Sequence, residues 1–75
     1  MSAELVRRAL QGDRVIATLR CFDEATGTTV EAEVTPPGGA ASVRRGPYRF
    51  ATAHEAFRFV QEAMLAFEYL GCTIG

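Results

Sequence analysis

The chain has 75 residues, which is enough for one small domain and too few for a second hydrophobic core. Hydrophobic residues make up 48% of the chain and charged residues 23%, a balance that excludes an intrinsically disordered protein. The net charge of -1 excludes a protein that attracts nucleic acid or an anionic membrane as a whole, so either partner would need a local basic patch.

All eight basic residues are arginine, a bias that is typical of a GC-rich bacterial genome. No apolar run approaches the ~18–20 residues that cross a bilayer, and residues 1–14 lack the apolar centre of a secretion signal. We therefore expect a cytoplasmic protein with no membrane partner. Cys21 and Cys72 have no metal-ligand spacing, so we expect reduced, structural thiols, with a disulfide between them as the alternative.

Residues 3–11 are expected to form a short helix. Their apolar side chains follow the i, i+1, i+4, i+5 spacing of one helix face: Leu5, Val6, Ala9 and Leu10. Gly12 is expected to end this helix in the left-handed conformation. A helix this short is not stable alone, so it must pack against the rest of the domain.

Residues 14–22 and 28–35 alternate between apolar and polar side chains, which predicts two strands of an antiparallel hairpin. A four-residue turn that ends at Gly27 connects them, because glycine adopts the left-handed conformation such a turn needs. The turn sets the register, in which Arg20 lies opposite Glu31 and both apolar sets share one face.

The segment 35–42 contains two prolines and two glycines and is predicted to be a connecting loop. Residues 43–50 are predicted to form a third strand. Gly46 and Pro47 interrupt it, which indicates an edge strand or a bulge.

Residues 53–70 are predicted to form the main helix. Thr52 and Glu55 match a capping box at its start. Gly71 is expected to close it, with Cys72 placed to pack on the last turn in a Schellman motif. The remaining residues are expected to add a short edge strand or to fray.

These elements predict an α+β fold in a single small domain, residues 1–75. The predicted order is α-β-β-β-α: a short N-terminal helix, a three-stranded antiparallel meander, and a long C-terminal helix packed on one face of the sheet.

The apolar residues of the main helix fill about half of its circumference, whereas a helix on a sheet needs a stripe of roughly 100°. This surplus, with Leu65 and Tyr69 on the polar side of the helix and two apolar residues on the outer hairpin face, indicates an interface. The function we expect is a small non-catalytic protein-interaction module, with a homodimer or another protein as its partner. The candidate interface residues are Ile16, Phe22, Phe59, Leu65 and Tyr69.

The alternative function is a weak nucleic-acid-binding module. Arginine interleaved with aromatic residues on a strand is one way in which a sheet holds nucleic acid. The candidate contacts lie on the third predicted strand: Arg44, Arg45, Tyr48 and Arg49. Glu31 and Glu33 on the neighbouring strand are placed to neutralise this patch, which favours the first function.

No group of residues predicts an enzyme. His54 is the only histidine and lies in the first turn of the main helix, with no nucleophile placed beside it. Asp13 and Asp23 both fall at turns, where bonding to the local backbone explains them. One histidine and two distant cysteines do not make a metal site. We therefore expect no catalytic residues, no metal and no cofactor.

Overall fold

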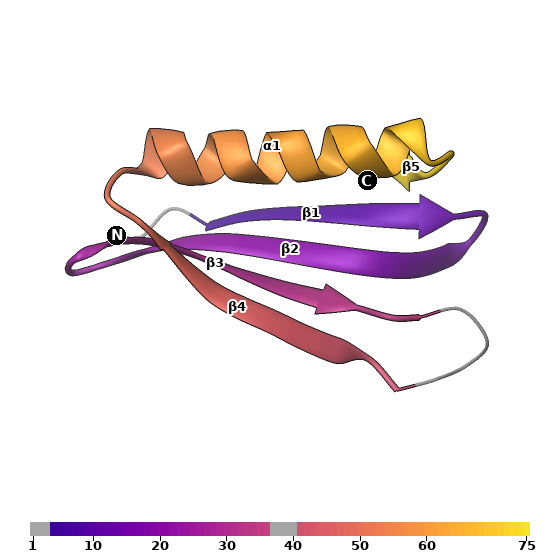
Figure 1. The fold of residues 1–75 in the computed structure, drawn as a ribbon, viewed down its shortest axis with the longest axis horizontal. Coiled ribbons are helices and arrows are strands. Elements are labelled where there is room, and N and C mark those ends of the chain that lie inside the picture. The colour runs from indigo at the N-terminus through magenta and orange to yellow at the C-terminus, as the bar shows by residue number, and fades with distance from the viewer. Residues whose placement is uncertain (1–3, 37–40) are drawn as a thin grey trace.

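The computed structural model describes residues 4–36 and 41–75. The strands are β1 (Glu4–Gln11), β2 (Arg14–Glu24), β3 (Gly27–Val34), β4 (Val43–Phe50) and β5 (Thr73–Ile74), and the helix is α1 (Ala53–Tyr69). All strand pairs are antiparallel, in the order β4-β3-β2-β1-β5. The helix lies across one face of this sheet (Figure 1). The predicted α-β-β-β-α order is therefore wrong, because the described residues form a sheet of five strands and one helix.

The N-terminal helix predicted over residues 3–11 is the main error, because Glu4–Gln11 is strand β1. Gln11 pairs with Arg14, so Gly12 and Asp13 form a two-residue turn in which Gly12 has φ of 64°. A Gly-Asp pair between two apolar segments is typical of a tight hairpin turn. The glycine therefore connects two strands and does not end a helix.

The choice of strand over helix depends on β2, because every residue of β1 from Glu4 to Gln11 pairs with it. Ala9, one of the four residues on the predicted helix face, is completely buried in the strand. A helix of this length has little stability of its own. Pairing with a neighbouring strand satisfies the same backbone groups and adds burial, so contacts distant in sequence decide the structure here.

The predicted hairpin of β2 and β3 is confirmed, including its register, with Arg20 opposite Glu31 and Cys21 opposite Val30. The turn is tighter than expected, because Glu24 and Gly27 already pair with each other. Gly27 has φ of 150°, and a Cβ atom there would clash with the carbonyl oxygen of Phe50 on β4. This close approach of two backbones requires glycine.

A β-bulge changes which side of the sheet Ile16 occupies. Ala9 pairs with Ala17 and Leu10 with Val15, so Ile16 is an extra residue on β2. It packs against the core and lines a small hollow beside the last turn of α1. We expected Ile16 on the outer face, and the bulge overturns that expectation.

The predicted third strand is confirmed as β4, an edge strand whose register shifts where Gly46 and Pro47 interrupt it. Tyr48 and Phe50 lie on its helix side. Both rings contact Phe59 of α1, with ring centroids 5.3 Å apart in each pair. Residues 37–40 of the predicted loop lie outside the described residues.

Both predicted ends of the main helix are confirmed. Thr52 is the N-cap, and its Oγ1 accepts a hydrogen bond of 3.2 Å from the amide of Glu55. At the other end, the amide of Gly71 bonds to the carbonyl of Glu68 and the amide of Cys72 to that of Phe67, which is the Schellman pattern. The chain then reverses into β5, which pairs with β1.

The core is a thin layer between α1 and the sheet. Its buried apolar residues are Ala9, Ala17, Leu19, Cys21, Val30, Ala56, Val60 and Met64. Only a narrow stripe of α1 belongs to this set. The apolar surplus predicted for the helix is still exposed in part, since Phe57 and Leu70 remain in contact with solvent. Leu65, expected on the polar side of the helix, is exposed as well.

Candidate interaction surface

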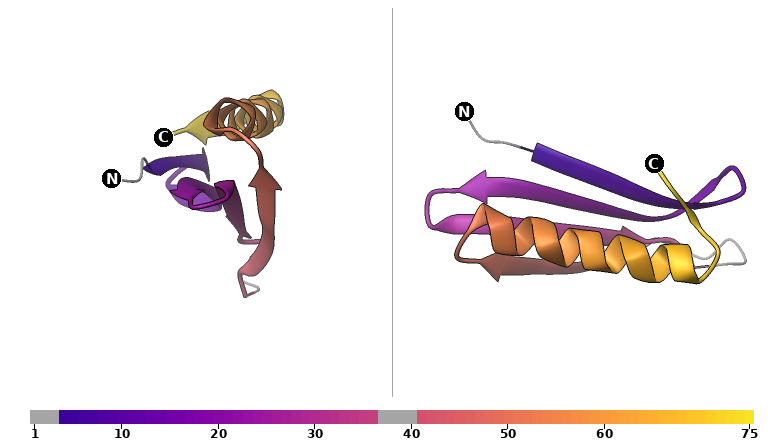
Figure 2. Two further views of the ribbon diagram at one scale, coloured as in Figure 1. Left: turned by 90° about the vertical axis from the view of Figure 1, so that its left-hand side faces the viewer. Right: turned by 90° about the horizontal axis from the view of Figure 1, so that it is seen from above.

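A groove runs between α1 and the first strand, and we call it the β1–α1 groove. The helix packs against all five strands, and viewed from above it diverges from the N-terminal half of β1 (Figure 2). The groove has a volume of about 460 Å³. Val60 and Met64 lie at its base, Leu5 lines it from β1, and Phe57 and Leu65 line it from the helix. Phe57 is 39% exposed and Leu65 is 56% exposed, so a single chain leaves this apolar surface uncovered.

The groove adjoins an open edge of the sheet. The short strand β5 pairs only with Ala9 and Leu10 of β1. Arg8 exchanges backbone hydrogen bonds with Gly75, and within residues 4–36 and 41–75 no strand continues along Glu4 to Arg7. The groove is lined by apolar side chains together with Arg7, Gln61 and Glu68. Apolar pockets beside unpaired strand backbone are the arrangement that strand-adding protein partners use.

The predicted interface residues do not lie together. Phe59 is held between Tyr48 and Phe50, where it helps to join α1 to β4. Leu65 lines the β1–α1 groove, whereas its neighbour Tyr69 does not line it and is 93% exposed. The bulge turns Ile16 to the helix side of the sheet, beside the last turn of α1 and outside the lining of the groove.

Phe22 is the one predicted interface residue that stays on the outer face of the sheet. It is half-buried and lies in register with Thr29 of β3, which is itself buried. With Ile16 turned to the helix side, the outer face no longer carries the apolar pair that was expected there.

Sequence reasoning missed Leu5, Phe57 and the open edge of β1. The apolar spacing of residues 3–11 predicts that Leu5 lies on a helix, and Phe57 is only one of the many apolar residues that fill half the circumference of the main helix. The Gly12-Asp13 pair was the signal that would have identified β1 as a strand. The exposure of Phe57 had no signal in the sequence, since it depends on where the helix lies on the sheet.

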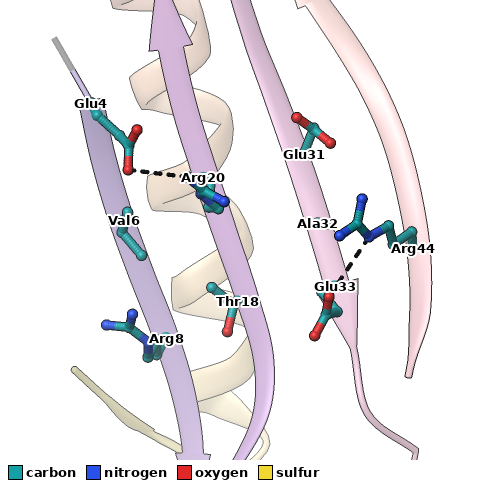
Figure 3. Close-up of a pocket in the computed structure, with 9 residues that line it drawn as sticks. All are labelled: Glu4, Val6, Arg8, Thr18, Arg20, Glu31, Ala32, Glu33 and Arg44. Carbon is teal, nitrogen blue, oxygen red and sulfur yellow. Dashed lines mark hydrogen bonds and ion pairs between the residues drawn. The ribbon is translucent and has the colours of Figure 1, made fainter. Parts of the chain in front are cut away.

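The outer face of the sheet has a second hollow, of about 470 Å³, whose charges are balanced (Figure 3). Three arginines and three glutamates line it: Arg8, Arg20, Arg44, Glu4, Glu31 and Glu33. Arg20 and Glu4 form an ion pair of 3.4 Å, and Arg44 and Glu33 one of 3.8 Å. A face with alternating charges does not provide the continuous positive track that a phosphate backbone requires.

The residues predicted to contact nucleic acid in the alternative function also lie apart from one another. Arg44 is paired with Glu33, which is the neutralisation that the sequence indicated. The ring of Tyr48 contacts Phe59. Arg45 and Arg49 are exposed and lie opposite Ala32 and Thr29 in the register of β3 and β4. The arginines and the aromatic ring therefore do not form one surface.

No protein-family model, curated protein or solved structure matches this chain. Its function is therefore inferred from the arrangement of its own residues.

The described residues contain few side chains that could bind a metal ion or act as a nucleophile. They contain no group of three or more His, Cys, Asp or Glu side chains that could hold a metal ion, and no helix among them is long and apolar enough to cross a membrane. Cys21 and Cys72 are both free thiols. Burial, and to a lesser degree the Asp23 carboxylate, raises the pKa of the Cys21 thiol, which makes it a poor nucleophile. His54 is exposed in the first turn of α1.

Proposed function

We propose that this chain is a non-catalytic protein-interaction module that associates with a second copy of itself through the β1–α1 groove. The observation that carries the proposal is the position of exposed Phe57 and Leu65 beside the open edge of β1. The two free thiols support a reducing, cytoplasmic location.

The thin core supports the same proposal. A single core of this size rarely supplies more than about 3–5 kcal/mol without a staple, a metal or a partner chain. The cysteines are not cross-linked, and the described residues contain no metal cluster. Burial of the groove against a partner would add apolar area where the single chain leaves it exposed.

Sedimentation equilibrium of the purified chain at micromolar concentration tests the proposal. We expect a species of twice the 8.1 kDa chain mass, in equilibrium with the monomer. Leu65→Glu places a charge in the groove and should weaken association by about tenfold or more, since ~1.4 kcal/mol is enough for that change.

Tyr69→Glu is the matched control, because it adds the same charge one turn further along the same helix, outside the groove lining. It should leave the association constant within about twofold of the unmodified chain, less than ~0.5 kcal/mol. A chain that stays at 8.1 kDa throughout contradicts the proposal. Equal weakening by the two substitutions also contradicts the assignment to the groove.

A further inference from the structure

We infer that two copies join edge to edge at β1, antiparallel and with the two-fold axis at Leu5, so that their sheets form one continuous sheet. The inference rests on the proposed self-association and specifies its geometry.

The first step is the direction of the free backbone groups of β1. Arg8 donates to the carbonyl of Gly75 at 2.9 Å and accepts from its amide at 2.8 Å, so its backbone groups point away from β2. Backbone groups alternate in direction along a strand. Val6 and Glu4 therefore direct their amides and carbonyls to the same open edge. The Val6 carbonyl accepts an exposed hydrogen bond of 3.2 Å from the guanidinium of Arg7.

The second step is the contrast with the other edge of the sheet, β4. Pro47 has no amide hydrogen to donate, and the strand is irregular at Gly46 and Pro47. Three arginines lie along this strand: Arg44, Arg45 and Arg49. Proline, irregular pairing and charge are features that prevent a sheet edge from adding another strand. The edge of β1 from Glu4 to Arg7 carries no proline and borders the β1–α1 groove.

The third step fixes the register. The backbone groups of Arg8 are occupied by Gly75, so the pairing of two copies must use Glu4 and Val6. Among the described residues, Glu4 and Val6 can supply each other's antiparallel partners only when Glu4 of each copy lies opposite Val6 of the other. Leu5 then lies opposite Leu5 of the second copy. A register centred on Val6 is excluded. It would place Glu4 of one copy opposite Arg8 of the other, and the backbone groups of Arg8 already pair with Gly75.

The fourth step concerns the apolar side chains that this register buries between the two copies. A two-fold axis perpendicular to the sheet keeps both helices on one face, on either side of the joined β1 strands. Leu5, Phe57 and Leu65 line the groove on that face, so both copies contribute these side chains to the space between the helices. The surface that a single chain leaves uncovered thus becomes the centre of the dimer.

The charges of β1 agree with this pairing. Glu4 and Arg8 flank Val6 on the outer face of the sheet. Arg8 is without an ion-pair partner within the described part of the chain. Antiparallel pairing about Leu5 brings Arg8 diagonal to Glu4 of the second copy, a spacing that long side chains of opposite charge can bridge. The edge is therefore complementary to itself.

Disulfide trapping tests the register. Leu5 pairs with its own copy at a non-hydrogen-bonded position, where the Cα atoms lie about 4.5 Å apart, within the range that a disulfide spans. Leu5→Cys in a Cys72→Ala background should therefore form a covalent dimer under mild oxidation, seen as a doubled mass without reductant. Arg7→Cys in the same background is the matched control. It lies on the same strand and face, but the two copies of this residue are too far apart to cross-link.

Hydrogen exchange of the unmodified chain gives a second measurement that needs no substitution. Raising the protein concentration should slow exchange of the Val6 amide and leave the amides of β4 unchanged. A dimer in sedimentation without the Leu5 disulfide, or with Val6 exchange that does not change, overturns the register and leaves self-association intact. A monomer at all concentrations overturns both.

Discussion

At the scale of single residues, Cys21 couples the stability of the domain to pH. It is completely buried in the core, in register with Val30 of β3. Burial raises the pKa of the thiol above its ordinary value of 9.0, and the Asp23 carboxylate adds to the shift. A raised pKa means that the folded state prefers the neutral thiol. This preference stabilises the fold below the ordinary thiol pKa and is lost as the pH rises through the folded-state value.

We therefore expect the free energy of unfolding to decrease as the pH is raised above 9.0, more steeply than it does for Cys21→Ala. Denaturant unfolding followed by circular dichroism at a series of pH values measures both slopes. Cys72→Ala is the control for loss of a cysteine, because it keeps the buried Cys21 thiol. An identical pH slope for Cys21→Ala and the unmodified chain would show that the buried thiol is not responsible.

At the scale of elements, the ends of α1 are specified by short-range contacts. The hydroxyl of Thr52 accepts from the Glu55 amide and donates to the Glu55 carboxylate at 3.1 Å, so this side chain satisfies one amide of the first turn and also holds the Glu55 side chain. The last turn closes through Gly71, whose φ of 95° favours glycine. Each of these contacts spans five residues or fewer.

Thr52→Ala should destabilise the domain by about 1 kcal/mol, because it removes the acceptor of the Glu55 amide. In a domain of this size that loss lowers the melting temperature by about 4–8 °C. Thr52→Ser keeps the hydroxyl and should melt close to the unmodified chain. A Thr52→Ala variant that melts at the same temperature as Thr52→Ser would show that the cap does not stabilise the helix.

The locality of these contacts explains which elements could be predicted. The helix caps and the register of β2 and β3 are encoded by neighbouring residues, so the sequence indicates them correctly. The segment that forms β1 has apolar spacing that suits a helix, and pairing with β2 overrides it. The bulge at Ile16 is equally non-local, because it exists only in the pairing of two strands.

At the scale of the whole molecule, the β1–α1 groove exists because of where α1 lies on the sheet. The sequence indicates that the helix has more apolar circumference than one sheet face covers, and it places Leu65 on the polar side of the helix as a candidate interface residue. It did not show that the helix would leave the N-terminal half of β1 uncovered (Figure 2). Leu5 and Phe57 could therefore not be selected, because their exposure follows from packing between distant elements.

A thin core that is completed by a second copy makes stability depend on protein concentration. Association draws the folded monomer into the dimer and stabilises it by mass action. A tenfold rise in concentration changes the association term by about 1.4 kcal/mol. Because the dimer contains two chains, each chain gains half of this free energy. The gain should raise the melting temperature of the unmodified protein by about 3–6 °C.

Differential scanning calorimetry over a tenfold concentration range that begins above the dissociation constant measures this shift. Leu65→Glu, with its charge in the β1–α1 groove, should show a smaller rise in melting temperature across the range, whereas Tyr69→Glu should retain the rise of the unmodified chain. Far-UV circular dichroism of both variants establishes that each is folded. If the unmodified chain melts at one temperature throughout, its core is complete in the single chain, because no bound copy then contributes to its stability.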